Sequence, residues 1–179
     1  MCEGDAVRPC GVIEFLDNIG MTSIRVGNGY DVHRLEKGLE MHLCGVKIES
    51  DMGFVAHSDG DVAIHALCDA LLGALALGDI GHLFPDSDPK YKGISSSILL
   101  EKVMYKVRER NYTLCNADIT IALQSPKLAP YIYEMRKRLA EICQVDMDSI
   151  SVKATTTERL GFVGREEGCE VWAIVVVMK

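Results

Sequence analysis

The sequence lacks an excess of basic residues, a long apolar run and the common nucleotide-binding loops. Its 179 residues carry a net charge of −7, which argues against nucleic acid as a partner because binding to a phosphate backbone needs clustered Lys and Arg. The longest apolar stretch, Val171 to Met178, has the length of a strand and is too short to span a membrane. Neither a Walker loop nor a G-x-G-x-x-G pattern is present.

Closely spaced cysteine pairs are also absent. The seven cysteines are scattered, and no two of them are spaced C-x-x-C. An odd, dispersed set argues against a disulfide framework or a zinc ribbon. Cys68 and Cys143 fall in helical patterns, where cysteine usually packs as a small apolar side chain. We therefore expect free thiols and a reducing, cytoplasmic compartment.

The first twenty residues, Met1 to Gly20, lack the basic segment followed by an apolar one that a signal peptide has. They contain several acidic residues, which a transit peptide would avoid, and Met21 could be the true start. We expect residues 1–22 to be an extension of unknown role. Residues 23–179 have the length of one ordinary domain.

Hydrophobic periodicity and the positions of Gly and Pro predict alternating strands and helices. The predicted strands are 23–33 (interrupted by Gly27 and Gly29), 41–48, 114–123, 150–155 and 169–178. The predicted helices are 58–77 (capped by Ser58 or Asp59), 95–110 and one that begins near Pro130, with a loop over 81–93. We expect an α+β fold in a single domain, built mainly on a four-stranded mixed sheet with helices on one face.

The last predicted strand is apolar on both faces. Val171, Ala173 and Val175 alternate with Trp172, Ile174 and further apolar residues. Helices are expected to cover only one face of the sheet, so the other face needs another partner. Copies of the same chain can supply that partner, and we expect a homo-oligomer.

Three residues form a candidate metal site. Asp31 and His33 are two residues apart on a predicted strand and therefore point to the same side. His65 lies on the predicted helix 58–77, on one face with Asp61 and Asp69. Three Asp and His ligands without a fourth are typical of a catalytic zinc site, in which water or a substrate oxygen takes the open position. An incidental D-x-H pair and a hydrogen-bonded core histidine are the alternatives, and His42 and His82 are expected to be surface residues.

Two segments have features of phosphate binding. His57 and Ser58 stand just before the predicted helix, where backbone N–H groups favour anions, although Ser58 could simply cap the helix. Thr155, Thr156 and Thr157 follow a strand and could hold phosphate oxygens, and Glu158 beside them suggests a shared Mg²⁺. The alternative is a Thr-rich turn with a solvated Glu. The Gly-rich stretch that follows ends in Arg165, which could reach an anion.

Taken together, these segments resemble the 2-C-methyl-D-erythritol 2,4-cyclodiphosphate synthase family of the non-mevalonate isoprenoid pathway. The resemblance rests on motifs in the family's order: R-V-G-N-G-Y-D-V-H from Arg25, H-S-D-G-D-V-A-I-H-A-L-C-D-A-L-L-G from His57, G-D-I-G-H-L-F-P-D-S-D from Gly78, S-P-K-L from Ser125 and K-A-T-T-T-E-R-L-G-F-V-G-R-E-E-G from Lys153. It covers 23–179. Asn28 and Tyr30 stand where many members have His and Phe.

The resemblance implies that Asp31, His33 and His65 bind zinc and that Glu158 holds Mg²⁺ or Mn²⁺ shared with the substrate. It implies that His57 and Thr156 stabilise the transition state. The remaining residues that it implies for the substrate are Ser58, Asp79, Ile80 and Gly81, the loop Phe84, Pro85, Asp86, Ser87 and Asp88, the cytidine pocket Leu123, Gln124, Ser125, Pro126, Lys127, Leu128 and Ala129, and then Thr155, Thr157, Phe162 and Arg165.

The implied reaction is the cyclisation of 4-diphosphocytidyl-2-C-methyl-D-erythritol 2-phosphate with loss of CMP. The implied assembly is a homotrimer with active sites between subunits, and Arg165 and Glu167 match positions near a three-fold axis where some members hold an isoprenoid diphosphate. Two other functions stay open. One is a metal-dependent phosphohydrolase that uses Asp59, Asp61 or Asp69 as a base, and the other is a trimeric ligand-binding protein with structural zinc.

Overall fold

A long strand, β1 (Ile24–Lys37), pairs antiparallel along its length with the last strand, β7 (Gly168–Met178). The computed structural model describes residues 23–85 and 88–179. β7 also pairs antiparallel with β5 (Thr113–Ala122), which pairs parallel with β6 (Ile150–Thr155). The short strand β4 (Met52–Phe54) pairs with the end of β1, so the sheet order is β4-β1-β7-β5-β6. The predicted α+β fold and mixed sheet are confirmed.

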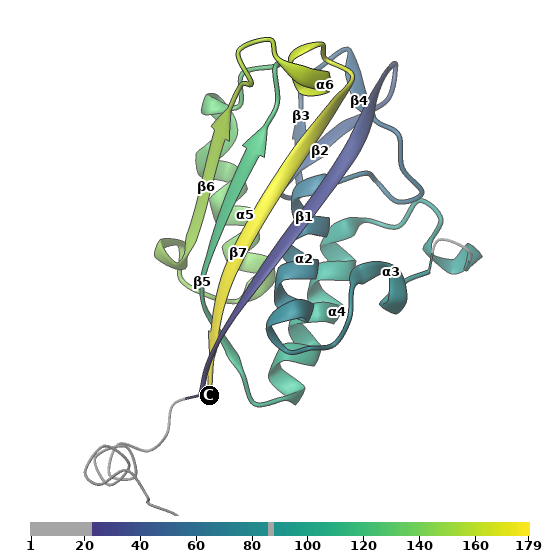
Figure 1. The fold of residues 1–179 in the computed structure, drawn as a ribbon. Coiled ribbons are helices and arrows are strands. Elements are labelled where there is room, and N and C mark those ends of the chain that lie inside the picture. Colours follow the sequence, from purple (N-terminus) through teal and green to yellow (C-terminus); the bar gives the residue numbers. More distant parts are fainter. Residues whose placement is uncertain (1–22, 86–87) are drawn as a thin grey trace, which may run out of the picture.

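Helices cover one face of this sheet, as predicted (Figure 1). The three long ones are α2 (Val62–Ala74), α4 (Ser96–Glu109) and α5 (Ile132–Cys143). α2 packs directly on β1 and β7, α4 packs on α2, and α5 packs on β6. Two single-turn helices, α3 (Ile80–Leu83) and α6 (Gly161–Gly164), lie in connecting segments. No helix in 23–85 or 88–179 is long and apolar enough to cross a membrane.

Several predicted boundaries were wrong. The sheet has five strands because β4 was not predicted, and 41–48 is a hairpin of β2 (Met41–Leu43) and β3 (Val46–Ile48). The hairpin turns at Cys44 and Gly45, which both have positive φ, and apolar residues on both sides hid that turn. The helix predicted over 58–77 is shorter, and Asp61, not Ser58 or Asp59, caps it by accepting the Ile64 N–H. The loop predicted over 81–93 contains most of α3.

The faces of β7 differ as the sequence predicted. Val171, Ala173 and Val175 are 0% exposed beneath the helices, whereas Trp172 and Ile174 on the other face are 39% and 47% exposed. The uncovered face is turned toward the viewer in Figure 1. It also contains the exposed apolar side chains of β1, which are Ile24, Val26, Tyr30 and Val32. We call this set, with Trp172, Ile174 and Met178, the open apolar face.

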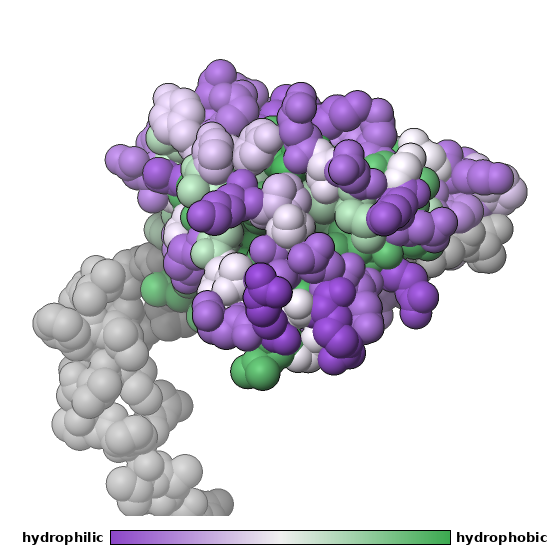
Figure 2. Space-filling model, turned by 90° about the horizontal axis from the view of Figure 1, so that it is seen from above, coloured by the Kyte–Doolittle hydropathy of each residue, from purple (hydrophilic) through white to green (hydrophobic). Residues whose placement is uncertain are grey.

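The end of the molecule at the top of Figure 1 has a different character. Figure 2 looks onto this end and shows mainly hydrophilic side chains with small apolar areas between them.

The described cysteines, Cys44, Cys68, Cys115, Cys143 and Cys169, are free thiols.

Candidate metal centre and active site

Two glycines bring β1 into direct contact with the backbone of α2. A Cβ atom added to Gly27 would lie 1.8 Å from the Ala70 carbonyl oxygen, and one added to Gly29 would lie 2.0 Å from that of Ala66. The strand therefore runs closer to the helix than any residue with a side chain permits. The sequence predicted that these glycines interrupt the strand. That prediction was wrong, because β1 is continuous through both of them. They let the next residues of β1 face His65 on α2.

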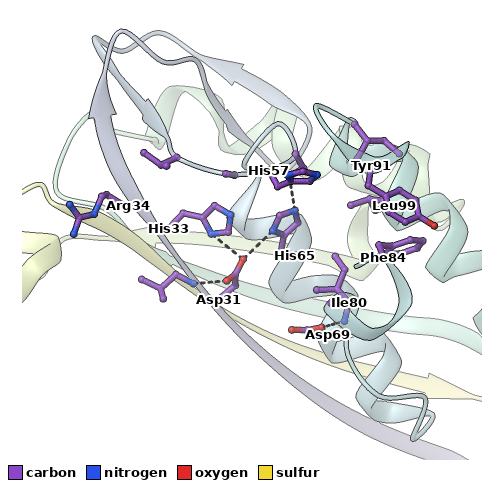
Figure 3. A pocket seen from close by; sticks show the side chains of 16 residues that line it. Asp31, His33, Arg34, His57, His65, Asp69, Ile80, Phe84, Tyr91 and Leu99 are labelled. Atoms are coloured by element: carbon purple, nitrogen blue, oxygen red, sulfur yellow. Dashed lines mark hydrogen bonds and ion pairs between the residues drawn. The ribbon is translucent and has the colours of Figure 1, made fainter. Parts of the chain in front are cut away.

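Asp31, His33 and His65 converge as predicted. Asp31 Oδ2 lies 3.2 Å from Nδ1 of His33 and 3.2 Å from Nδ1 of His65 (Figure 3). The three ligand atoms all lie within 4.8 Å of one another. A tetrahedral zinc ion with bonds of about 2.0–2.1 Å has ligands about 3.3–3.4 Å apart. The two separations from Asp31 Oδ2 are close to that geometry.

The charges of the cluster also suit a cation. Asp31 Oδ2 is buried between Nδ1 of His33 and Nδ1 of His65, and Oδ1 accepts a hydrogen bond from Val32 N. A buried carboxylate oxygen needs a donor or a positive charge beside it. Burial is the largest influence on the pKa of His65 and lowers it, but the carboxylates of Asp31, Asp61 and Asp59 together leave that pKa raised. The site is thus one that attracts positive charge, and the ligands fit a divalent metal.

Asp61 and Asp69 share the helix face of His65 but have other roles. Asp61 is buried and accepts hydrogen bonds from the N–H groups of Cys44, Gly45 and Ile64 at 2.6–3.0 Å. It therefore fixes the β2–β3 turn to the start of α2. Asp69 accepts a hydrogen bond from Ile80 N at 2.7 Å (Figure 3), which holds α3 against α2.

A cavity of about 360 Å³ opens beside the metal ligands. His57 and Ser58 line it, as do three other predicted substrate residues, Ile80, Gly81 and Phe84. His57 Nε2 is buried and has no hydrogen-bond partner among the described residues, which leaves it available to a ligand. Three other predicted substrate residues do not line this cavity, namely Asp79, Pro85 and Asp88. The Asp79 side chain instead caps α3, and the Asp88 side chain caps the turn Pro89–Tyr91. Asp86 and Ser87 lie outside the described residues.

A second cavity of about 250 Å³ lies where β5 and β6 end. The predicted cytidine residues line it, with the exception of Ser125, and so do two of the threonines: Leu123, Gln124, Pro126, Lys127, Leu128, Ala129, Thr155 and Thr156. The segment from Leu123 to Ala129, which was predicted to form a pocket, thus does line a single cavity.

The Thr-rich turn folds back on itself beside the second cavity. Thr156 Oγ1 donates to Glu158 Oε1 at 2.9 Å, and Thr157 Oγ1 donates to the Leu160 carbonyl at 2.7 Å. Glu158 and Arg159 both have positive φ (52° and 64°), a conformation that is strained for residues with side chains. Such strain is common where a side chain must be aimed at a ligand. The exposed Glu158 carboxylate is available for a cation.

Phe162 and Arg165 line neither of these cavities. The Arg165 guanidinium instead donates two hydrogen bonds to the Glu167 carboxylate, at 2.9 and 3.0 Å. Phe162 packs over Gly168 at the start of β7. Within one chain, the structure thus does not join these residues to the predicted substrate site.

The metal cluster and the second cavity lie far apart in one chain. Asp31 on β1 pairs with Val171 on β7, and the same row continues through Ile121 on β5 to Ala154 on β6. Strands are about 4.8 Å apart, so this row places Asp31 about 14 Å from Ala154. Two strands, β7 and β5, therefore separate the metal ligand Asp31 from the end of β6, which Thr156 and Glu158 follow.

Several residues of the site were not predicted for it. Arg34 and Tyr91 line the first cavity, and Ser96 contacts His65 from α4. Arg34 directly follows the ligand His33 on β1, whereas Tyr91 and Ser96 reach the site only through the tertiary fold.

A one-sided α+β fold with a three-ligand His/Asp cluster at a cavity is typical of metal-dependent enzymes. A model of the YgbB family matches residues 24–178, and the chain belongs to that family. The 2-C-methyl-D-erythritol 2,4-cyclodiphosphate synthase of Acinetobacter baumannii (strain SDF) is 55% identical over 157 residues, which are 88% of this chain and 98% of that relative.

Solved structures agree with this assignment. The bifunctional IspDF from Campylobacter jejuni matches with a TM-score of 0.85 and 47% identity, over 88% of this chain and 42% of that longer chain. A 2C-methyl-D-erythritol-2,4-cyclodiphosphate synthase in a CDP-bound form matches with a TM-score of 0.80 and 40% identity, over 86% of this chain and 99% of the other.

Proposed function

We propose that this chain converts 4-diphosphocytidyl-2-C-methyl-D-erythritol 2-phosphate into 2-C-methyl-D-erythritol 2,4-cyclodiphosphate and CMP. The relatives that match nearly end to end bear the name of this synthase. The observation that carries the proposal is the convergence of Asp31, His33 and His65 beside a cavity that His57 also lines.

The reaction needs no nucleophile from the protein. An oxygen of the 2-phosphate attacks the β-phosphorus, the new P–O bond closes the ring, and the bond from the β-phosphorus to the CMP oxygen breaks. The protein must fold the substrate back on itself and offset the charge of two phosphate groups brought together. A zinc ion bound by the three ligands would supply Lewis-acid charge neutralisation. His57 Nε2 and the Ser58 hydroxyl would donate hydrogen bonds to phosphate oxygens.

We assign the second cavity to the cytidine. A CDP-bound relative of the same fold supports a cytidine nucleotide as ligand, and backbone groups of Leu123 to Ala129 would read the base. Glu158 would hold Mg²⁺ or Mn²⁺ between itself and the diphosphate, because carboxylate oxygens are the ligands these ions prefer. Thr155, Thr156 and Thr157 would donate to the phosphates. Phe162 and Arg165 would complete the site in the assembled enzyme.

A homotrimer would bring these parts together. One substrate must contact both the metal cluster and the cytidine cavity, yet about 14 Å separates their strands within one chain. The open apolar face gives a second reason, because exposed apolar patches of this kind usually mark an interface. Active sites would then form between copies, and an axial cavity near Arg165 and Glu167 would be the place for an isoprenoid diphosphate. We keep the cytoplasm as the predicted compartment.

The proposal is tested by His65→Ala with His82→Ala as the matched control. His82 is an exposed histidine on α3 that lies outside both cavities. We expect His65→Ala to retain its fold by circular dichroism, to lose most of its zinc after dialysis and to show little turnover, while His82→Ala keeps both properties. Full turnover by metal-free His65→Ala would exclude the assigned role.

A further inference from the structure

The ring nitrogen of His65 that faces away from Asp31 contacts a hydroxyl group of another helix. Its Nδ1 faces Asp31, while its Nε2 lies 3.0 Å from Ser96 Oγ and 3.2 Å from Ser58 Oγ. Figure 3 shows the contact of the His65 ring with Asp31. Ser96 is the first residue of α4 and is 0% exposed, so its hydroxyl group depends on protein partners.

Ser96 has a second partner, which fixes the direction of the hydrogen bonds. Its Oγ lies 2.5 Å from Asp59 Oδ1, and its N–H donates to Asp59 Oδ2 at 2.9 Å. An ionised carboxylate can only accept hydrogen bonds, and O–H···O⁻ bonds have this short length. The Ser96 hydroxyl therefore donates its proton to Asp59. Its lone pairs remain free to accept a hydrogen bond from His65 Nε2–H.

The consequence concerns the tautomer of His65. If Nε2 carries the proton, Nδ1 carries the lone pair, and that lone pair is directed at Asp31 and His33. A metal ligand must have its lone pair there, and the partner of the other ring nitrogen normally decides which nitrogen binds. The backbone holds Asp59 in place, since Asp59 N donates to the Ile94 carbonyl at 3.1 Å.

We propose that Ser96 and Asp59 are positioning residues that hold His65 as its Nε2–H tautomer and so orient Nδ1 toward a divalent metal. This inference rests on the metal site proposed above. It assigns to Asp59 a role that differs from that of a general base. Asp59 does not line the cavity beside the metal ligands, and its carboxylate is occupied by Ser96.

A purely structural role is the competing explanation, because the Asp59 carboxylate also receives a backbone N–H at the start of α4. That contact stabilises the helix end but does not need the Ser96 hydroxyl. The two explanations therefore differ in what removal of the hydroxyl group alone does to the metal.

Ser96→Ala removes only this hydroxyl, and Ser97→Ala is the matched control. Ser97 is the next residue of α4 and is likewise buried, at 7% exposed. We would titrate zinc against a competing chelator for wild type and both variants. We expect Ser96→Ala to bind zinc about 10- to 100-fold more weakly, as is usual for loss of a group that orients a ligand, and Ser97→Ala to match wild type. Wild-type zinc affinity in folded Ser96→Ala would overturn the inference while leaving the proposed function intact.

A second measurement does not depend on how the variant folds. In zinc-loaded wild-type protein labelled with ¹⁵N-histidine, long-range ¹H–¹⁵N spectra report which ring nitrogen carries the proton and which one binds the metal. The His65 signals are those lost in His65→Ala. We expect the proton on Nε2. A proton on Nδ1 would overturn the inference, whatever Ser96→Ala does. Failure of wild-type protein to bind zinc in the titration would instead refute the proposed metal site together with the inference.

Discussion

Gly29→Ala should damage the metal site without touching a ligand. The added Cβ would lie 2.0 Å from the Ala66 carbonyl oxygen, whereas ordinary contact begins at 3.4 Å. The obstacle is helix backbone, which cannot rotate away as a side chain would, so β1 must move outward by roughly 1.4 Å, the difference between these two distances. Asp31 and His33 would move with the strand, away from His65, which is 3.2 Å from Asp31.

Zinc–ligand distances normally lie within about 0.2 Å of their usual values, so we expect the displaced ligands to bind zinc about 100-fold more weakly or worse. Overpacking should also reduce the free energy of unfolding by about 1–3 kcal/mol. Chelator competition measures the first effect and urea unfolding the second. Gly73→Ala on α2 is the control, because its nearest neighbour would be the Asn28 carbonyl oxygen at 3.8 Å. Wild-type zinc affinity and stability in Gly29→Ala would refute this reasoning.

Three further predictions concern stability and assembly. Asp61→Ala should lower the free energy of unfolding by about 3–5 kcal/mol, because three backbone N–H groups lose their acceptor; a shift in the urea midpoint at constant slope would measure this, and a loss below 1 kcal/mol would contradict it. Ile174→Glu on the open apolar face should yield monomers in sedimentation, with turnover lost and zinc affinity kept; an unchanged assembly would exclude that face as the interface. Burial raises the pKa of Asp69 although the Ile80 N–H opposes this. Because the folded state holds this proton more tightly than the unfolded state, Asp69 stabilises the fold at a pH below its ordinary pKa. That contribution is lost as the pH rises from the ordinary pKa through the raised one of the folded state. Asparagine does not titrate, so Asp69→Asn should gain stability relative to wild type as the pH rises through this range. A gain that is independent of pH would contradict the assignment.

Periodicity predicted the parts of the fold that depend on local pattern. The helix over 95–110 is observed as α4, and the strand over 114–123 is observed as β5, because their apolar residues alternate as each element requires. The β2–β3 turn and β4 were missed since three-residue strands carry almost no periodic signal. The cap of α2 was misplaced because Ser58, Asp59 and Asp61 are all good capping residues, and only the tertiary contact with the β2–β3 turn selects Asp61.

Local pattern likewise predicted some residues of the candidate site and missed others. The D-x-H pair and His65 could be recognised because strand and helix periodicity place them on definite faces, but their convergence depends on close packing at Gly27 and Gly29. Ser96, which contacts His65, and Asp59, which contacts Ser96, are 37 residues apart, and no spacing rule connects them. The roles of Thr156 and Glu158 in a site shared between copies of the chain remain predictions.

Phosphorus NMR of the purified protein with 4-diphosphocytidyl-2-C-methyl-D-erythritol 2-phosphate, Mg²⁺ and Zn²⁺ tests the proposed reaction most directly. We predict two mutually coupled signals from a cyclic diphosphate, accompanied by CMP in equal amount. Inorganic phosphate or an open-chain phosphate in place of the cyclic product would contradict the account. It would favour hydrolysis by a metal-bound water, with Asp69 as the base, since Asp69 alone of the three candidate aspartates lines the cavity beside the metal ligands.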